Sequence, residues 1–311
     1  MGKNEADRHK QRTTHGTSSR PWIGFVRSKG VEAVFSRLTG SVVRAVLVMI
    51  LIATPTVLLF DLRQDSQQLV ALVALFAGAL TFAEYNSIYP GLVEFRDAPP
   101  FNRMRFLMLF VTVFCLSAIE RGRVHPSTMT ELIHAVGAVI GYSMDFPYSP
   151  VRLATLMLPV DANPALVGAV RTAAGMAYLI SLLSLGIFAT MIGAGRWPSR
   201  EKPFNVWINL PTFDPTSGGD VVARLTRDSR INIALGFLLP FLIPAVVRIA
   251  GAGFVPMTLT SPQTLIWTMT AWAFLPASLF MRGIAMGRVA EMIRERRALE
   301  RSGASPRYSA A

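Results

Sequence analysis

Side chains that could do chemistry are rare in this chain, and they are most dense between Glu84 and Arg105. The stretch reads EYNSIYPGLVEFRDAPPFNRMR and joins two apolar segments. Glu84 falls inside the first of these segments, where an ionised carboxylate is costly and marks either a function or a paired partner. We expect that partner to be Arg103 or Arg105, which a Pro-Pro turn brings back toward Glu84, or the distant Arg282.

Three roles fit this stretch, and the sequence leaves them open. An ion pair would pin apolar helices together. Alternatively, the arginines would form a phosphate or carboxylate site, with tyrosine rings at the depth of the lipid headgroups. Proton coupling through Glu84 is the third role. The candidate ligand or ion-pair residues are Glu84, Tyr85, Tyr89, Arg96, Arg103, Arg105 and Arg282.

A second group of polar residues falls between 131 and 145. At helical spacing its members lie within about 60° of one another, so they form one polar stripe. One histidine and two carboxylates could ligate a metal, but their spacing matches no metal-binding motif and we expect none here. A polar seam satisfied within the protein is the expectation, with catalysis or substrate binding as alternatives. The residues are Glu131, His134, Tyr142 and Asp145.

Glycines and arginines are expected to fix this second region against its neighbours. Gly137 and Gly141 form a GxxxG seam at which another helix can approach closely. Arg171 and Arg248, in later apolar segments, are the candidate partners for Glu131, Asp145 or Asp161.

Several catalytic patterns are missing from the sequence. It contains no glycine-rich phosphate loop of the Walker type, no HExxH and no GxSxG. Asp214 and Asp220 flank a turn, which predicts a turn and a helix cap rather than a metal site. We therefore assign no catalytic residue and no cofactor.

The composition indicates the class of protein that must position these residues. The 311 residues are 51% hydrophobic and only 16% charged, and the mean hydropathy is +0.41. These values are typical of an all-α, polytopic membrane protein. Cys115 is the single cysteine, so no intrachain disulfide forms.

About six transmembrane helices follow from the apolar segments. A further segment near 129–146 has only ten uncharged residues in a row, from 135 to 144. That length is too short to cross about 30 Å of hydrocarbon, so it predicts a re-entrant or interfacial helix. The predicted spans are 42–60, 69–89, 106–119, 166–192, 231–254 and 264–286.

The two ends of the chain have their own character. Residues 1–20 are polar and basic, which predicts a disordered tail. Residues 21–40 predict an amphipathic helix lying on the membrane surface. Residues 287–311 predict a charged cytoplasmic tail after the transmembrane domain of 42–286.

The distribution of basic residues predicts the orientation. With six spans, 24 lysines and arginines fall on the side of the termini and four on the other side. The positive-inside rule therefore predicts that both termini are cytoplasmic. Abundant alanine, glycine and arginine suggest a bacterial source, and hence the cell inner membrane.

The loop before the fifth span carries one resemblance to a known family. Ile208, Asn209, Leu210 and Pro211 resemble the I-x-L-P close of the coupling loop in ABC importer permeases. The resemblance implies a permease subunit that works with an ATPase. The Glu-Ala-Ala and glycine that precede this close in the family are absent, and the corresponding stretch contains two prolines.

These observations favour an integral membrane protein without catalytic activity of its own. We expect it to bind the anionic lipid bilayer or membrane-protein partners in an assembly or scaffold role, and not nucleic acid. The alternative is a transporter or permease subunit that uses Glu84 and the proline-broken fifth span. A membrane-embedded enzyme acting on a lipid headgroup is the third hypothesis.

Overall fold

The computed structural model describes residues 22–59, 64–194, 197, 205–214, 216, 218–251 and 259–302. These described residues form helices and connecting segments, with no strand among them. Six of the helices are long and apolar enough to cross a membrane. The prediction of an all-α, polytopic membrane protein is confirmed.

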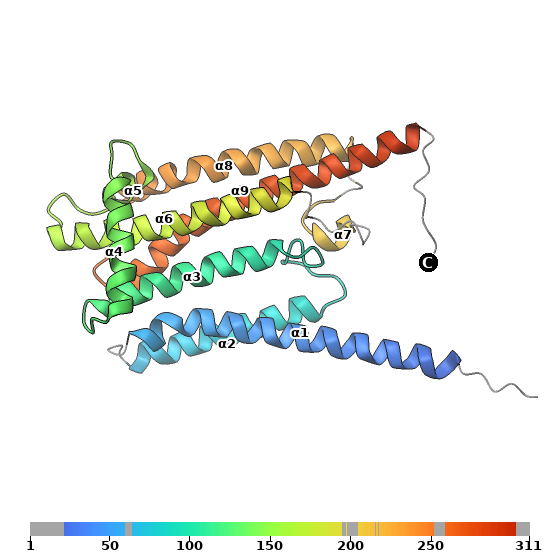
Figure 1. Ribbon diagram of the computed structural model, residues 1–311, viewed down its shortest axis with the longest axis horizontal. Helices are drawn as coiled ribbons and strands as arrows, with labels where there is room; N and C mark the ends of the chain where they lie inside the picture. The colour runs from blue at the N-terminus through green and yellow to red at the C-terminus, as the bar shows by residue number, and fades with distance from the viewer. Residues whose placement is uncertain are drawn as a thin grey trace, which may run out of the picture.

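The spanning helices all run along the long axis of the molecule (Figure 1). They are longer than the predicted spans because their polar ends continue the same helices. Their bounds are α1 (Trp22–Leu58), α2 (Gln64–Asn86), α3 (Phe101–Gly122), α6 (Pro164–Gly193), α8 (Val221–Gly251) and α9 (Pro262–Arg301). The shorter helices are α4 (Thr128–Ser143), α5 (Pro150–Thr155) and α7 (Val206–Asn209).

The bundle has two distinct ends. α1 begins and α9 ends at one of them, where α7 and the loop of residues 87–100 also lie (Figure 1). We call this the terminal end. At the other end α4 lies across the bundle, together with α5, and we call it the α4 end. With six spans, an even number, the first span must begin and the last span must end at the same end of the bundle, as α1 and α9 do here.

Two helices reach well beyond the thickness of a bilayer. α9 has 40 residues and α1 has 37, which correspond to about 60 and 55 Å, whereas the hydrocarbon core is about 30 Å thick. Figure 1 shows both projecting past their neighbours at the terminal end. The charged end of α9 therefore lies outside the hydrocarbon.

The surface helix predicted over 21–40 is not a separate element. α1 runs without a break from Trp22 to Leu58, so the residues of the predicted surface helix continue into the first span. No proline interrupts 38–42, and the helix tolerates Gly40, whose carbonyl accepts a hydrogen bond from the Arg44 side chain at 2.7 Å. The predicted disordered tail of 1–20 and residues 303–311 lie outside the described residues.

As its composition predicted, α4 does not run along the bundle with the spanning helices. Its 16 residues correspond to about 24 Å, less than the hydrocarbon thickness, and it lies across the other helices (Figure 1). Ser127 caps its first turn and forms a capping box with Thr130. A helix lying across the α4 end fits the interfacial form of the prediction.

The GxxxG seam of α4 packs directly on α6. A Cβ on Gly141 would come within 2.5 Å of the carbonyl oxygen of Arg171, and a Cβ on Gly175 would collide with the backbone of Gly141. The two helix backbones therefore touch at these glycines. The predicted close approach is confirmed.

α8 and α9 form an antiparallel pair that also depends on small residues. Gly236 faces Pro276 and Phe280, and the Ser229 hydroxyl donates a hydrogen bond to the Gly283 carbonyl at 2.7 Å. The Pro240 carbonyl accepts a hydrogen bond from the Trp272 indole at 3.0 Å. Neighbouring side chains thus stabilise the proline-containing turns of α8, as in other buried helices.

Candidate functional site

The loop of residues 87–100 is anchored at the terminal end by a cluster of aromatic rings. Phe95 is fully buried, and its ring centre lies 4.5 Å from that of Phe101 and 5.5 Å from that of Trp197. The Trp197 indole donates a hydrogen bond to the Ala98 carbonyl at 2.9 Å. This burial holds Phe95 at a φ of 52°, a region that non-glycine residues rarely adopt.

α7 fastens the same loop through Asn209. The Phe95 N–H donates to the Asn209 carbonyl at 2.6 Å, and the Asp97 N–H donates to the Asn209 side-chain oxygen at 3.1 Å. Sequence reasoning missed this role of Asn209, because 112 residues separate it from Asp97. The loop is therefore a fixed part of the terminal end.

Glu84 does not form the expected ion pair with arginine. Its Oε2 accepts hydrogen bonds from the backbone N–H groups of Gly91, Leu92 and Val93, at 3.0, 2.9 and 3.3 Å. α2 ends at Asn86, so the chain turns back and presents these amides to the carboxylate. Among the described residues Glu84 has no ion pair with Arg103, Arg105 or Arg282, and backbone amides of the loop take the place of the expected guanidinium.

The two tyrosines of this stretch have different surroundings. The guanidinium carbon of Arg44 lies 4.6 Å from the ring centre of Tyr85, a cation–π contact between α1 and α2. Tyr89 lies after the end of α2 and is 81% exposed, so the predicted second span ends earlier than 89. Only Tyr85 takes part in the packing of the spanning helices.

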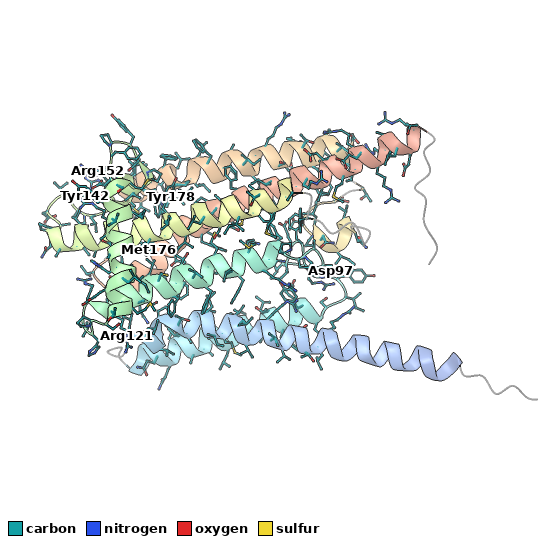
Figure 2. All side chains as sticks on the ribbon, in the orientation of Figure 1. Asp97, Arg121, Tyr142, Arg152, Met176 and Tyr178 are labelled. Atoms are coloured by element: carbon teal, nitrogen blue, oxygen red, sulfur yellow. The ribbon has the colours of Figure 1, made fainter. Side chains whose placement is uncertain are left out.

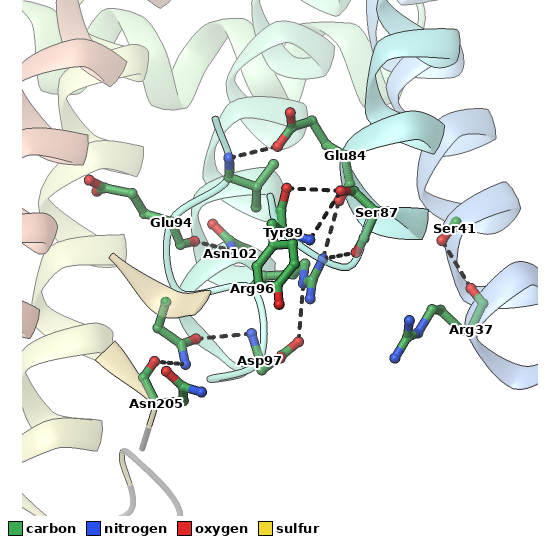
Figure 3. Close-up of polar contacts among 12 residues, drawn as sticks. Arg37, Ser41, Glu84, Ser87, Tyr89, Glu94, Arg96, Asp97, Asn102 and Asn205 are labelled. Carbon is green, nitrogen blue, oxygen red and sulfur yellow. Dashed lines mark hydrogen bonds and ion pairs between the residues drawn. The ribbon is translucent and has the colours of Figure 1, made fainter. Parts of the chain in front are cut away.

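Arg96 is used to shape the loop. Its guanidinium donates a hydrogen bond to the Ser87 carbonyl at 2.6 Å and contacts the Asp97 carboxylate at 3.3 Å (Figure 3). The Arg96 side chain is only 9% exposed. It is therefore not free to bind a ligand.

Arg282 of α9 pairs with Glu94, which the sequence analysis did not single out. Two parallel hydrogen bonds of 2.6 and 2.8 Å join the guanidinium to the carboxylate. Asn232 of α8 accepts a third hydrogen bond from Arg282 at 3.0 Å, and the Thr212 hydroxyl donates to Glu94 at 2.7 Å. This network ties the loop to α8 and α9, and bidentate geometry makes it strong.

The pair is mostly shielded from water. The Glu94 side chain is 11% exposed and the Arg282 side chain 26% exposed. Burial alone would raise the pKa of Glu94, but the hydrogen bonds from Arg282 and Thr212 and the charge of Arg282 bring this pKa below its usual value. Glu94 is therefore a structural anion at neutral pH.

Arg103 and Arg105 do not converge on a common ligand. Arg103 is exposed, whereas the guanidinium carbon of Arg105 lies 5.3 Å from the ring centre of Phe101 and 5.9 Å from that of Phe274. The buried Nε of Arg105 has no hydrogen-bond partner among the described residues. The arginines of this stretch are thus distributed over separate contacts rather than gathered into one anion site.

At the α4 end the structure brings together part of the predicted polar stripe. Asp145 lies 2.6 Å from Arg171 and 3.1 Å from Arg152, and its side chain is 8% exposed. The predicted pairing of Arg171 with an acidic residue of this region is confirmed. Arg248 instead donates hydrogen bonds to the carbonyls of Leu156 and Leu158, at 3.2 and 2.8 Å.

The rest of the stripe points to solvent or lipid. Glu131 and His134 are exposed, and Tyr142 is 77% exposed (Figure 2). In the part of the chain that the structure describes, no three His, Cys, Asp or Glu residues are placed to hold a metal ion. Glu131, His134 and Tyr142 are therefore not joined to Asp145 in one site.

Glu120 is a buried acid that sequence reasoning missed. Its side chain is only 3% exposed, and one oxygen pairs with Arg123 at 3.0 Å. The other oxygen, Oε1, is buried and has no hydrogen-bond partner within the described ranges. The only signal in the sequence was a carboxylate near the end of an apolar segment, beside two arginines.

A cleft between α8 and α9 gathers basic residues at the terminal end. Arg227, Arg230 and Arg294 line it, together with the apolar side chains of Val222 and Ile231. Arg230 and Arg294 have no ion pair or hydrogen bond among the residues described.

The acidic residue of this cleft is already neutralised. Asp220 lies 2.6 Å from Arg297 and accepts a hydrogen bond from the Ala223 N–H at 3.2 Å, capping α8. The hydrogen bond from Arg297 lowers the pKa of Asp220. Asp214 accepts a hydrogen bond from the Thr216 N–H at 2.8 Å, so the predicted turn and cap are confirmed. The cleft therefore carries a net positive charge.

Comparison with known proteins gives no relative. No protein-family model matches the chain, and no curated protein or solved structure matches it either.

The residues that resemble the coupling loop are folded against the protein itself. Leu210 is fully buried and Asn209 is 3% exposed, and Asn209 holds the loop of residues 87–100. In this chain these residues serve an internal contact.

Among the described residues, Arg230 and Arg294 of the cleft are cationic groups that remain available at the terminal end. Arg96 and Arg282 are engaged by the loop, and Arg105 is covered by aromatic rings. Unpaired guanidinium groups beside apolar side chains are suited to a phosphate that sits at the boundary of hydrocarbon and water.

Proposed function

We propose that this multi-pass membrane protein binds anionic lipid headgroups at its terminal end, in an assembly or scaffold role rather than a catalytic one. The observation that carries the proposal is the basic cleft between α8 and α9. Its arginines lie where the charged ends of these helices leave the hydrocarbon. Each arginine near an anionic membrane surface contributes about 1 kcal/mol to binding.

The remaining polar groups of the terminal end support a binding role. Glu84 accepts three backbone hydrogen bonds on one oxygen and Glu94 pairs with Arg282, so both carboxylates have partners within the protein. This favours a structural role for Glu84 over the role that the transporter hypothesis gives it. The fixed loop of residues 87–100 supplies a rigid platform on which lipid or a membrane-protein partner can rest.

The location that goes with this function is also part of the proposal. The excess of basic residues on the side of the termini supports a cytoplasmic position for the terminal end. The composition supports a bacterial inner membrane, whose anionic lipids face these arginines.

The proposal is tested by the thermal stability of the full chain in neutral detergent with added lipid. Phosphatidylglycerol should raise Tm more than phosphatidylcholine does, because a ligand that binds the native state stabilises it. Raising the ionic strength should reduce the difference by screening the charges.

Variants locate the effect. The triple change Arg227→Ala, Arg230→Ala and Arg294→Ala should abolish the preference for phosphatidylglycerol. Arg103→Ala is the matched control, since Arg103 is an exposed arginine of the same end that does not line the cleft. Equal stabilisation by the two lipids in the unaltered protein would refute the proposal.

A further inference from the structure

A second hollow lies nearer the middle of the bundle, along the same two helices. It is a groove between α6, α8 and α9. Its wall contains Leu182, Phe237 and Phe241, and of these Leu182 is 46% and Phe237 61% exposed. The groove therefore opens sideways, toward the hydrocarbon of the bilayer.

Small residues line the floor of this groove. Gly236 lets α8 touch α9 there, and Ala273 and Ala277 of α9 offer only methyl groups. The Ser181 hydroxyl donates a hydrogen bond to the Ala273 carbonyl at 3.2 Å, so this polar group of the wall is satisfied. An apolar occupant matches such a wall, because a polar one would lose its hydrogen bonds to water there.

The groove and the basic cleft lie on the same side of the α8–α9 seam. On α8, Phe237 and Phe241 follow Arg230 by seven and eleven residues, which places the three within about 40° of one another around the helix. On α9, Phe280 and Arg294 are within about 40° by the same measure. Asn232 lies on the other side of the seam, where it meets Arg282.

The spacing along α8 fits one lipid molecule. From Arg230 to Phe241 the helix rises about 16 Å, and one leaflet of hydrocarbon is about 15 Å thick. A phosphate held at Arg230 would thus place an acyl chain of the same molecule against Phe237 and Phe241. Neither hollow alone has this combination of a cationic end and an apolar wall one leaflet long.

We propose that the cleft and the groove together form a specific site for a single anionic phospholipid. The phosphate binds the arginines between α8 and α9, and one acyl chain lies in the groove between α6, α8 and α9. The inference rests on the proposed function, which requires only headgroup binding, and adds the acyl-chain site and the stoichiometry. Charge complementarity at the cleft selects an anionic lipid as the occupant.

The test is native mass spectrometry of the full chain, released from detergent with added phosphatidylglycerol or phosphatidylcholine. One phosphatidylglycerol molecule should stay bound under conditions that strip phosphatidylcholine. Arg230→Ala and Arg294→Ala should each weaken its retention about fivefold, from about 1 kcal/mol per arginine. A short-chain phosphatidylglycerol should bind the unaltered protein more weakly than the long-chain form, because it does not fill the groove.

A groove variant separates this inference from the proposed function. Leu182→Trp fills the groove and should weaken retention of long-chain phosphatidylglycerol, whereas Leu183→Trp should not. Leu183 is the matched control because it is the next residue, is 57% exposed and does not line the groove.

Each outcome has a definite meaning. Headgroup preference without any effect of chain length or of Leu182→Trp would overturn the acyl-chain site and leave headgroup binding standing. Equal retention of both lipids that is insensitive to Leu182→Trp would overturn both proposals. Equal retention of both lipids, sensitive to Leu182→Trp, would instead show a groove for any apolar chain and overturn the anionic site.

Discussion

The carboxylates of Glu84 and Glu94 are each held by donors that the local geometry brings close. Glu84 sits three residues from the start of a tight loop and meets backbone amides. Glu94 lies within that loop and meets the guanidinium of Arg282. A carboxylate with three amide donors or a bidentate arginine has its charge stabilised within the protein, so neither acid depends on a ligand for a partner.

The Glu94 pair gives the protein a defined pH dependence. Because the folded-state pKa of Glu94 is lower than that of an unfolded glutamate, about 4.3, the stabilisation is complete above that pH. It is lost as the pH falls through the folded-state pKa.

Glu94→Gln should therefore lower the stability at pH 7 by about 3 kcal/mol, the cost of breaking a shielded pair. The difference in Tm between the variant and the unaltered protein should narrow at pH 3. Asp97→Asn is the control, because the Asp97 side chain is 55% exposed and such pairs contribute about 0–1 kcal/mol. A Tm difference that stays constant between pH 7 and pH 3 would contradict the role of Glu94 as the anion that pairs with Arg282.

At the scale of elements, close helix packing depends on glycines at a few positions. α4 rests on α6 through Gly137, Gly141 and Gly175, and α8 rests on α9 through Gly236 and Gly283. Membrane helices gain little from the hydrophobic effect when they associate, so backbone approach and van der Waals contact carry the packing.

The contact between α4 and α6 can be tested with two changes in one helix. Gly175→Ala should destabilise the protein by about 1–3 kcal/mol, since its methyl group would overlap the backbone of Gly141 and force the helices apart. Gly168→Ala should be neutral or stabilising by up to about 1 kcal/mol, because nothing lies within 4 Å of the added Cβ. Thermal unfolding in detergent measures both, and a similar response of the two variants would argue against the packing.

At the scale of the whole molecule, the two ends of the bundle have different chemistry. The terminal end carries the projecting helices, the anchored loop and the basic cleft. The α4 end is closed by a helix lying across it and by the Asp145 ion pairs. An asymmetry of this kind favours one orientation in the membrane.

Reporter fusions test that orientation. With 24 basic residues on the side of the termini and four on the other, a fusion after Arg301 should report the cytoplasm, and one at Val124 the opposite side. A reporter active outside the cytoplasm when fused after Arg301 would contradict the six-span topology.

The sequence by itself determined the class, the six spans and the short α4, because apolar length is a local property of a segment and the bilayer sets the threshold. It also determined the glycine seam of α4, since GxxxG is read from five consecutive positions. Of the expected ion pairs, it found Arg171 as a partner for Asp145, which α4 and α6 bring together.

Only the tertiary structure decided which acid meets which arginine at the terminal end. Arg282 and Glu94 are separated by 188 residues, and their contact depends on how the loop folds back over α8 and α9. The same holds for the cleft, whose Arg230 and Arg294 belong to different helices. Charge and hydropathy show that a residue needs a partner, but the choice among distant partners follows from which helix faces pack together.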